Sequence, residues 1–476
     1  MTEPFASDFA SLPLAPAVLA NVAKLGYAAM TPIQAAALPP ILQGHDVIGQ
    51  AKTGSGKTAA FGLGALHRLK PLGSAERPPQ TLVLCPTREL ADQVARELRL
   101  LARATPNVKV VVLCGGVPIR THRDTLAHGA DIVVGTPGRL RALIERNSLV
   151  LDALSVVVLD EADRMLDMGF EKDLRAILQK APSERQTLLF SATYPDAIQH
   201  LSAGYQRSPQ HVRVDLEMAE GQLQERFFEV HGAQPLPTLD EKNDALLKLL
   251  AHYQPASALV FCNTRDDCHV VARALRRAGV RSLALNGDLE QRERDEVLVV
   301  FANGSCSVLV ATDVAARGLD IPDLDCVINY ELSNDPAVHT HRIGRTGRAG
   351  KQGLALSLFD GTQKNRLERI EAQAGGPGSL QRVKLNTLEA RELAPRPELV
   401  TLRIEGGRKD KLRPGDILGA LTGEGGIEGT AVGKIDVQDA RSYVAVQRAV
   451  EKRALDVLQA GRIKKMRFRV AKVAAG

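Results

Sequence analysis

Residues 46–69 read DVIGQAKTGSGKTAAFGLGALHRL, and this stretch decides the fold. A short apolar run ending at Gln50 leads through a turn containing Gly54 and Gly56 into a helical run, Ala59–Leu69. Glycines let the backbone curl until several N–H groups face one anion, and the N-terminus of the following helix adds partial positive charge. Strand, glycine-rich turn and helix in this order predict a loop that binds the phosphates of a nucleotide.

Two side chains of this loop have an expected chemical role. Lys57 would reach the β- and γ-phosphates, and the hydroxyl of Thr58 would ligate Mg²⁺. Ala51 stands where the general pattern has glycine, which costs little if that position needs no positive φ. The expected cofactors are therefore ATP and Mg²⁺, and the expected contacts are Ala51, Lys52, Thr53, Gly54, Ser55, Gly56, Lys57 and Thr58.

A second polar motif follows another apolar run. Val156–Leu159 is succeeded directly by Asp160-Glu161-Ala162-Asp163. A nucleotide site of this kind needs a carboxylate near the metal and a group that activates water, which we assign to Asp160 and Glu161 respectively. An exposed acidic turn would have the same composition, but its place at the end of a buried strand favours the metal site.

Short β-rich apolar runs alternate with amphipathic helical stretches from residue 45 onward, which is typical of parallel sheets covered by helices on both faces. The first series of expected strands is Asp46–Gln50, Thr81–Cys85, Val108–Leu113, Ile132–Val134, Val156–Leu159 and Thr187–Phe190. The second is Ala258–Phe261, Ser282–Leu285, Val308–Val310, Cys326–Asn329 and Gly353–Leu358. Two series of similar length predict two α/β lobes rather than one large sheet.

The expected boundaries are a first lobe at 1–210, a connector at 211–240, a second lobe at 241–372, a connector at 373–399 and a C-terminal domain at 400–476. That last domain alternates strand, helix, two strands, helix and strand, the βαββαβ order of ferredoxin-like RNA-recognition modules. Its expected elements are Val400–Ile404, a helix after Pro414, Val432–Val437, Ser442–Val446, Gln447–Leu458 and Lys464–Val470.

The positive charge of the chain is concentrated at its C-terminus. Residues 401–476 hold 16 Lys and Arg against 9 Asp and Glu, whereas the rest holds 45 against 46. A basic cluster can be a solvated face, but an excess confined to one domain favours a polyanionic partner. Aromatic residues make up 4% of the chain and Trp is absent, which argues against broad platforms for base stacking.

The six cysteines include no Cys-x-x-Cys pair and lie mostly in apolar runs, which is typical of buried thiols in a reducing compartment. The first ten residues have no basic region before an apolar stretch, and no uninterrupted apolar span predicts a membrane helix. We expect a cytoplasmic protein. No heptad pattern or apolar stripe indicates an obligate dimer, so we expect a monomer.

With Asp-Glu-Ala-Asp at 160–163, the chain resembles the DEAD-box family of RNA helicases, whose fold is two RecA-like lobes of the P-loop NTPase type. Phe9, Gly26-Tyr27 and Thr31–Gln34 resemble the adenine-reading Q motif of that family. Its remaining motifs are matched by Pro86–Leu90, Gly115-Gly116, Thr136–Arg139, Ser191–Thr193, Val260–Thr264, Gln291 with Arg294, Ala311–Asp313, Arg317–Asp320 and His341–Arg348. One departure is Asn286 before Gly287-Asp288, where many relatives have His.

The resemblance assigns roles that composition does not. It implies that Arg345 and Arg348 are arginine fingers, worth about 10³–10⁵ in rate, and that Asp320 contacts the ribose. Catalysis is then expected from Lys57, Asp160, Glu161, Arg345 and Arg348, and adenosine contacts from Phe9, Tyr27, Gln34 and Asp320. Expected contacts with the RNA backbone are Thr87, Arg88, Gly115, Gly116, Thr136, Pro137, Gly138, Arg139, Asn263, Thr264, Arg265, Gly287, Gln291, Arg294 and Thr312.

The C-terminal domain is similar to the RNA-binding domain of the DbpA subfamily, in Leu402–Lys409, Arg413–Gly423 and Gly461–Lys465. This resemblance implies binding to a hairpin of large-subunit (23S) ribosomal RNA in pre-ribosomal particles, and local unwinding during assembly of that subunit. Tyr443 and Phe468 are the only aromatic residues expected on its sheet, so basic side chains would carry most of the recognition. The expected contacts are Arg403, Lys409, Lys411, Arg413, Tyr443, Lys464, Lys465 and Arg467.

Three other functions share parts of this pattern. A general RNA chaperone or RNA-decay helicase would use the basic domain as a non-specific anchor. A non-catalytic RNA clamp would bind ATP without turnover, although Lys57, Glu161, Arg345 and Arg348 are all present. A DNA translocase would share the two-lobe core, but the complete Q motif and the Asp-Glu-Ala-Asp sequence favour RNA.

Overall fold

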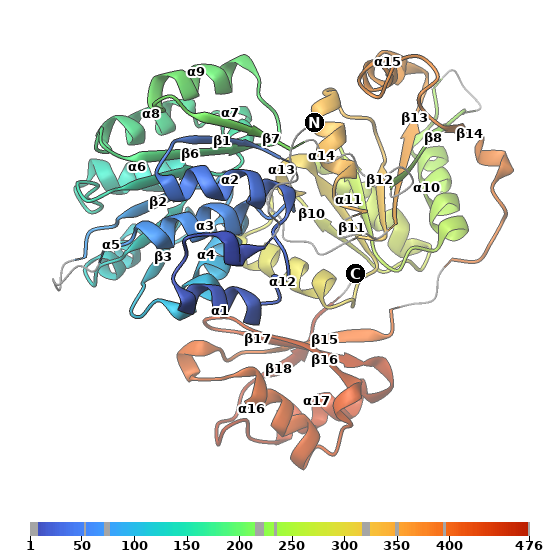
Figure 1. Cartoon of the computed structure of the whole chain (residues 1–476). Helices are drawn as coiled ribbons and strands as arrows, with labels where there is room; N and C mark the ends of the chain where they lie inside the picture. The colour runs from blue at the N-terminus through green and yellow to red at the C-terminus, as the bar shows by residue number, and fades with distance from the viewer. Residues whose placement is uncertain are drawn as a thin grey trace. The chain divides into compact units, whose positions relative to one another are not determined.

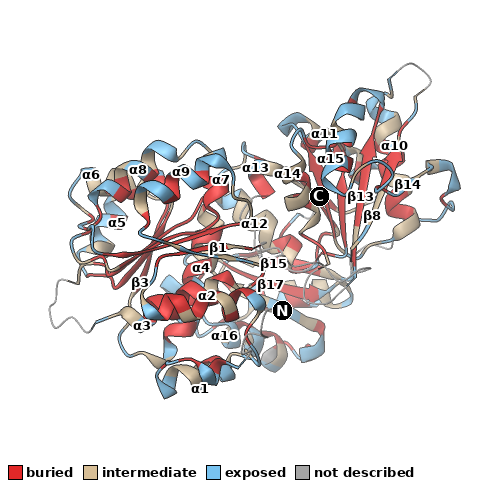
Figure 2. Ribbon diagram, turned by 45° about the horizontal axis from the view of Figure 1, so that its top comes forward, coloured by how far each residue is buried: buried red, intermediate tan, exposed pale blue. Residues whose placement is uncertain are grey.

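The computed structural model describes residues 8–51, 54–70, 77–214, 223–232, 236–316, 324–347, 352–393 and 397–474. Its strands form two seven-stranded sheets and one four-stranded sheet (Figure 1). The first sheet and its helices make one compact unit, and the other two sheets belong to a second. Buried residues gather in the strands and on the helix faces that cover them (Figure 2). The expected α/β architecture with an additional C-terminal domain is confirmed.

The first sheet is parallel, in the order β3-β4-β2-β5-β6-β1-β7. Its strands are β1 (Val47–Gln50), β2 (Thr81–Leu84), β3 (Val110–Leu113), β4 (Ile132–Gly135), β5 (Val156–Leu159), β6 (Gln186–Ser191) and β7 (Gln210–Arg213). Its helices are α1 (Pro16–Lys24), α2 (Pro32–Gln43), α3 (Lys57–Arg68), α4 (Arg88–Leu101), α5 (Ile119–Leu126), α6 (Pro137–Glu145), α7 (Ala162–Asp167), α8 (Glu171–Lys180) and α9 (Asp196–Tyr205).

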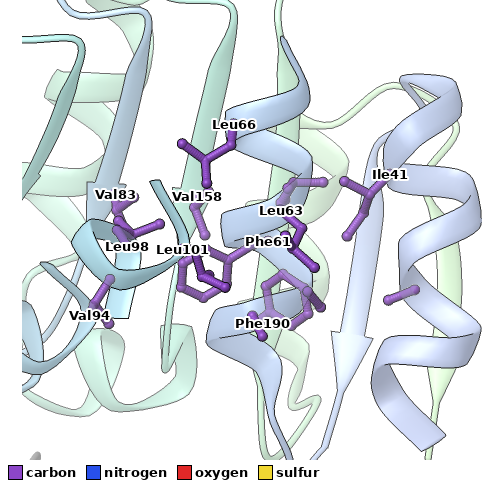
Figure 3. Close-up of a cluster of buried hydrophobic side chains, with 14 of the residues drawn as sticks. Ile41, Phe61, Leu63, Leu66, Val83, Val94, Leu98, Leu101, Val158 and Phe190 are labelled. Atoms are coloured by element: carbon purple, nitrogen blue, oxygen red, sulfur yellow. The ribbon is translucent and has the colours of Figure 1, made fainter. Parts of the chain in front are cut away.

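Alternate residues of β1 to β6 enter different cores. Val83 and Val158 pack with Phe61 of α3 on one face, in the cluster shown in Figure 3. Leu82 and Val157 pack on the other face. The rings of Phe61 and Phe190 lie 5.5 Å apart, so α3, which begins at the phosphate loop, is anchored directly to the sheet.

The second sheet repeats the first. Its order is β10-β11-β9-β12-β13-β8-β14, so when each set is numbered along the chain both sheets follow 3-4-2-5-6-1-7. Its strands are β8 (Leu223–Glu229), β9 (Ala258–Cys262), β10 (Ser282–Leu285), β11 (Val308–Thr312), β12 (Cys326–Asn329), β13 (Gly353–Phe359) and β14 (Arg382–Val383). Its helices are α10 (Leu239–Tyr253), α11 (Arg265–Arg277), α12 (Gln291–Ala302), α13 (Asp313–Ala316), α14 (Pro336–Ile343) and α15 (Lys364–Gln373).

The structure corrects both expected connectors. Segment 211–240 contains most of β7, which completes the first sheet, and all of β8, which lies inside the second. Segment 373–399 contains β14, and Leu388 within it is buried in the core of the second sheet. These strands were missed because β7 is largely exposed, β8 mixes polar with apolar residues, and β14 has two residues.

The C-terminal domain has the expected βαββαβ order. Its sheet is antiparallel, β16-β17-β15-β18, and its elements are β15 (Leu399–Ile404), α16 (Pro414–Gly419), β16 (Val432–Val437), β17 (Ser442–Gln447), α17 (Glu451–Ala460) and β18 (Val470–Lys472). Two expected bounds are wrong. The helix begins at Glu451 after a 3₁₀ turn, and the last strand begins at Val470 because residues 463–466 form a tight turn closed by Ile463 and Met466.

One face of this C-terminal sheet contacts α12 of the second lobe. Arg403 of β15 donates to both carboxylate oxygens of Glu296 at 2.8 and 3.2 Å, and the hydroxyl of Tyr443 lies 3.3 Å from the same group. Beside them, the hydroxyls of Ser305 and Thr401 are 2.8 Å apart. Polar groups on two domains thus satisfy one another in a partly buried contact.

All six cysteines are free and buried. This agrees with the expectation of reduced, buried thiols. Among the helices of the described ranges, none has the length and apolar character needed to span a bilayer.

Candidate functional site

The phosphate loop joins β1 to α3. Gly54 and Gly56 have φ of +84° and +90°, and a Cβ on Gly56 would lie 2.4 Å from Gln34 Nε2, so glycine is required there. Ala51 is not among the described non-glycine residues with positive φ, which explains why alanine is tolerated in this loop. The buried ammonium of Lys57 donates to Ala51 O at 3.0 Å, within the loop that it would complete. Lys52 and Thr53 lie outside the described residues.

The start of α2 fastens this loop. Thr31 and Gln34 form a capping box, in which Gln34 Oε1 accepts from Thr31 N at 2.9 Å. The same two side chains reach the loop backbone, because Thr31 Oγ1 donates to Ser55 O at 2.7 Å and Gln34 Nε2 donates to Gly56 O at 3.0 Å. The rings of Phe9 and Tyr27 pack edge to face, 6.1 Å apart. Sequence analysis assigned Gln34 to adenine; the structure adds a direct hold on the phosphate loop.

The two acids at the end of β5 are both buried. Oδ1 of Asp160 has no hydrogen-bond partner in the described part of the chain. Burial raises the pKa of Asp160 to about 7, although the charge of nearby Lys57 acts in the opposite direction. A buried carboxylate oxygen without a described partner, beside a lysine and a phosphate loop, would suit a ligand of a divalent cation.

Glu161 occupies a strained position. Its φ is +52°, in the left-handed region that disfavours a side chain, and it precedes α7 directly. Oε2 accepts from Arg164 at 2.9 Å, and both side chains are about 6% exposed. Glu161 directly follows Asp160 after β5, and its carboxylate is paired there with the guanidinium of Arg164.

Asp163 connects the acidic motif to β6. Its Oδ2 accepts from Ala192 N at 3.2 Å, and from both the backbone N and the hydroxyl of Thr193 at 2.9 Å. In the reverse direction, Ser191 Oγ accepts from Asp163 N at 3.3 Å. The Ser191–Thr193 motif and the acidic motif are therefore joined by hydrogen bonds through Asp163.

The expected RNA-contacting residues of the first lobe follow β2, β3 and β4. Thr87 caps α4, accepting from Leu90 N at 3.3 Å, and Arg88 lies next to it, 3.6 Å from Asp92. Thr136, Pro137 and Gly138 open α6. Gly116 has φ of +78° and follows Gly115 in the turn after β3. The structure thus gathers these residues at the carboxyl edge of one sheet, the usual location of sites in open parallel sheets.

In the second lobe, Arg342 organises the motifs. Its side chain is 1% exposed and makes two bonds to Asp313, at 2.6 and 2.7 Å, with further bonds to Asn263 Oδ1, Asn329 Oδ1 and Glu331 O. The guanidinium also lies 5.1 Å from the ring centre of Phe261. Sequence analysis gave Arg342 no role, although it lies inside a motif. Its burial in a hydrogen-bond network could not be predicted, because its partners are distant in the sequence.

Other expected residues of this lobe are held by side-chain bonds. Thr264 caps α11, and the exposed Arg265 pairs with Asp288 at 2.5 Å. On α12, Gln291 Nε2 donates to Asp295 at 2.9 Å, and Arg294 donates to Ala315 O at 2.6 Å. Thr312 Oγ1 accepts from Ala315 N at 3.4 Å, and Gly287 is exposed.

Asn286 is fully buried between His269, 2.9 Å away, and Asp288 N, 3.0 Å away, so this departure from the usual His supports the turn. Arg345 is buried immediately after α14. Arg348 and Asp320 lie outside the described residues.

The C-terminal basic residues separate into two groups. Arg403 and Tyr443, two of the expected RNA contacts, also contact Glu296 of α12, as described above. Lys411, Lys464 and Lys465 have φ of 61°, 51° and 68°, and Lys464 Nζ donates to Lys411 O at 2.8 Å. Lys409, Arg413 and Arg467 are exposed. We call Lys411, Arg413, Lys464 and Lys465 the cationic edge; within it, Lys464 Nζ also lies 3.7 Å from Asp416.

Models of protein families match most of this chain. Residues 31–201 match "DEAD/DEAH box helicase", residues 241–350 match "Helicase conserved C-terminal domain", and residues 401–472 match "DbpA RNA binding domain". ATP-dependent RNA helicase DbpA of Escherichia coli K12 is 50% identical over 468 residues, which cover 96% of this chain and 97% of that protein. The chain belongs to the DEAD-box family.

Other DEAD-box proteins agree with this assignment. CshA of Geobacillus kaustophilus is 42% identical over 384 residues, covering 80% of this chain and 79% of that protein. The structure of Dbp5 from S. cerevisiae bound to RNA and ADP BeF3 superimposes with a TM-score of 0.69 and 30% identity, over 80% of this chain and 96% of that one. The chain is an ATP-dependent RNA helicase with a DbpA-type RNA-binding domain.

A residue that sequence analysis missed lies in the first DEAD-box lobe. His122 is the only buried residue of α5, and its Nδ1 is 2.9 Å from the guanidinium of Arg139, which also donates to Val117 O at 2.6 Å. A single sequence does not indicate a role for a lone His in a polar helix, because that role depends on Arg139, which the fold brings next to it.

Proposed function

We propose that this chain unwinds short RNA duplexes locally and that its C-terminal domain directs it to a hairpin of large-subunit (23S) ribosomal RNA during assembly of that subunit. The observation that carries the proposal is the match of residues 401–472 to the DbpA RNA-binding domain, in a chain that aligns with a DbpA along nearly its whole length. A motor without that domain would have no source of RNA selectivity among its described contacts.

In the proposed nucleotide site, Asp160 and Thr58 would hold Mg²⁺, which when bound would neutralise charge on the transferred phosphoryl group. Lys57 binds the β- and γ-phosphates from within the loop that Gln34 and Thr31 fasten. Glu161 orients and deprotonates the attacking water. Its contact with Arg164 favours the ionised carboxylate, which is the form that accepts a proton.

Coupling of ATP to RNA is proposed to run through closure of the two lobes. The second lobe brings Arg345 and Arg348 to the γ-phosphate, and the bonds of Arg342 fix the helix that precedes them. In the first lobe, Asp163 joins the acids to Thr193, so a change at the phosphates reaches the residues after β6. Hydrolysis then requires both lobes, and RNA favours their closed state.

Recognition by the C-terminal domain is proposed to use the cationic edge of Lys411, Arg413, Lys464 and Lys465. Backbone strain at three lysines persists only where the surroundings impose it, and such strain gathers at binding sites. Since Arg403 and Tyr443 are occupied by Glu296, we assign them to orienting the domain on the second lobe. The proposed form is a monomer acting on pre-ribosomal particles.

The test compares RNA-stimulated ATPase rates. A large-subunit rRNA fragment carrying the candidate hairpin is matched against an equal mass of unrelated structured RNA. Strong stimulation by the rRNA fragment alone supports targeted assembly. The double variant Lys464→Ala/Lys465→Ala should lose this preference, whereas Lys452→Ala, an exposed lysine on α17, should keep it. Equal stimulation by both RNAs overturns the targeting and favours a general chaperone with a non-specific anchor.

A further inference from the structure

We propose that His122 is a positioning residue that holds Arg139 ready for an RNA phosphate while leaving the positive charge of that arginine uncancelled. The inference rests on the proposed RNA-backbone role of Arg139. It adds a residue outside the recognised motifs, on a helix whose other residues are at least partly exposed.

The geometry ties Arg139 to two acceptors from the segment after β3. Its NH1 donates to Val117 O at 2.6 Å and lies 2.9 Å from His122 Nδ1. His122 is 5% exposed, so its ring is fixed by packing and cannot turn to another partner in solvent. Two contacts therefore hold one nitrogen of the guanidinium. Because the guanidinium is planar and rigid, these contacts also restrict the orientation of its other nitrogens.

The chemistry of the pair fixes the state of the imidazole. A guanidinium has donors only, so the 2.9 Å contact requires a lone pair on Nδ1, and the ring must be neutral with its proton on Nε2. Burial first, and then the charges of Arg139 and Arg88, lower the pKa of His122 to about 4. The ring consequently stays neutral through the physiological range.

A neutral acceptor has a specific advantage at an RNA site. The other expected RNA-contacting arginines with a side-chain partner face carboxylates: Arg88 is 3.6 Å from Asp92, and Arg265 is 2.5 Å from Asp288. A carboxylate orients a guanidinium but offsets its charge, and it competes with phosphate for the same donors. Backbone carbonyl and imidazole orient Arg139 without that competition, so its full charge is available to a phosphate.

His122 also lies where three expected RNA-binding segments meet. Arg88 is close enough to influence its pKa, and the guanidinium of Arg88 passes 3.5 Å from the position that a Cβ on Gly116 would occupy. His122 thus contacts Arg139 of α6 directly and is near enough to Arg88 of α4 to feel its charge.

The first experiment measures the RNA concentration that gives half-maximal ATPase stimulation, at several salt concentrations, in the full-length chain. His122→Leu should raise that concentration roughly tenfold and lower its salt slope by about one, as expected for loss of one oriented phosphate contact. His122→Gln, which keeps a neutral acceptor, should stay close to wild type. Thr121→Ala on the same helix is the matched control.

Two further variants separate this inference from the proposed RNA role. Arg139→Ala should weaken RNA binding at least as much as His122→Leu, and the double variant should be no weaker than Arg139→Ala alone, because both remove one interaction. If Arg139→Ala has no effect, the RNA role itself fails. If Arg139→Ala weakens binding and His122→Leu does not, only the positioning role is overturned.

The protonation state of the His122 ring can be measured without any variant. Nitrogen NMR of the native chain should show His122 as the neutral tautomer protonated on Nε2 between pH 6 and pH 8. A proton on Nδ1, or titration near the ordinary His value, overturns the inference. So does a His122→Leu variant that loses ATP binding without RNA, because that result marks a purely structural core histidine.

Discussion

The two motor sheets share one strand order but differ in the side chains at their carboxyl edges. The first ends in a phosphate loop and two buried acids, Asp160 and Glu161, of which one has an oxygen without a partner in the described structure. The second ends in a buried arginine, Arg342, whose donors are engaged by Asp313 and three other acceptors. At the first edge, Asp160 has an oxygen that could accept from or coordinate a ligand. At the second edge, the donors of Arg342 are used in hydrogen bonds within the lobe.

This difference shows how a repeated scaffold can divide labour. A parallel sheet places whatever follows its strands at one edge, so the same topology serves either a site or a brace. In the first lobe the edge groups are those that we propose to bind nucleotide and RNA. In the second, Arg342 stiffens α14, which carries the segment that ends at Arg345.

The largest effect is expected in the first lobe. Glu161→Gln should lower RNA-stimulated ATP turnover by about 10²–10⁴-fold, because the amide cannot accept the proton of the attacking water. ATP and RNA binding should persist, as measured by fluorescence titration beside steady-state ATPase rates. Glu171→Gln, which removes an exposed partner of Arg175 in the same lobe, should be unaffected. If Glu161→Gln kept its ATP turnover, the catalytic assignment of Glu161 would be wrong.

Removing Arg342 should lower the stability of the second lobe. Arg342→Ala leaves Asp313 and several acceptors without their donor, and breaking such a buried pair costs about 3–5 kcal/mol. We expect faster hydrogen exchange in α14 and β12, with exchange in β1 and α3 unchanged. Arg369→Ala, an exposed arginine on α15, is the control. Equal loss of protection in the first lobe would contradict the separation of the two edges.

A smaller effect is expected where the second lobe meets the C-terminal sheet. Glu296→Ala removes the acceptor shared by Arg403 and Tyr443, a partly buried charged contact worth about 1–2 kcal/mol. Exchange of the amides of α12 and β17 should accelerate, while the ATPase rate with unstructured RNA should change little. Arg292→Ala on the same helix tests for a non-specific effect. Unchanged exchange would show that the contact does not hold the domain.

The smallest effect concerns acid stability of the first lobe. The pKa of His122 falls to about 4 on folding, below its ordinary value of 6.5, so the unfolded chain takes up the proton first. Stability that is present above pH 6.5 is therefore lost as the pH falls towards 4. His122→Gln should lose less protection in β3 and α5 between pH 7 and pH 5 than the native chain does. An identical pH response would argue against a buried neutral ring.

Much of this comparison was visible in the sequence. Buried parallel strands have continuous apolar runs, so eleven of the fourteen motor strands were located, and the motifs named the groups after β1 and β5. The missed strands β7, β8 and β14 have mixed or very short patterns. The RNA role of Arg403 and Tyr443 stays a prediction from charge and aromaticity, which are local properties. Their contact with Glu296 could not be predicted, because it joins residues more than a hundred positions apart.

The six buried thiols make this chain convenient for spectroscopy. Because burial shields the native sulfurs, maleimide dyes should react with cysteines introduced on exposed helices and leave the others unmodified. One dye on α8 and one on α11 would report the distance between lobes in single molecules, without first removing any native cysteine. The opening and closing cycle can thus be followed in the native background, with ATP and RNA added in either order.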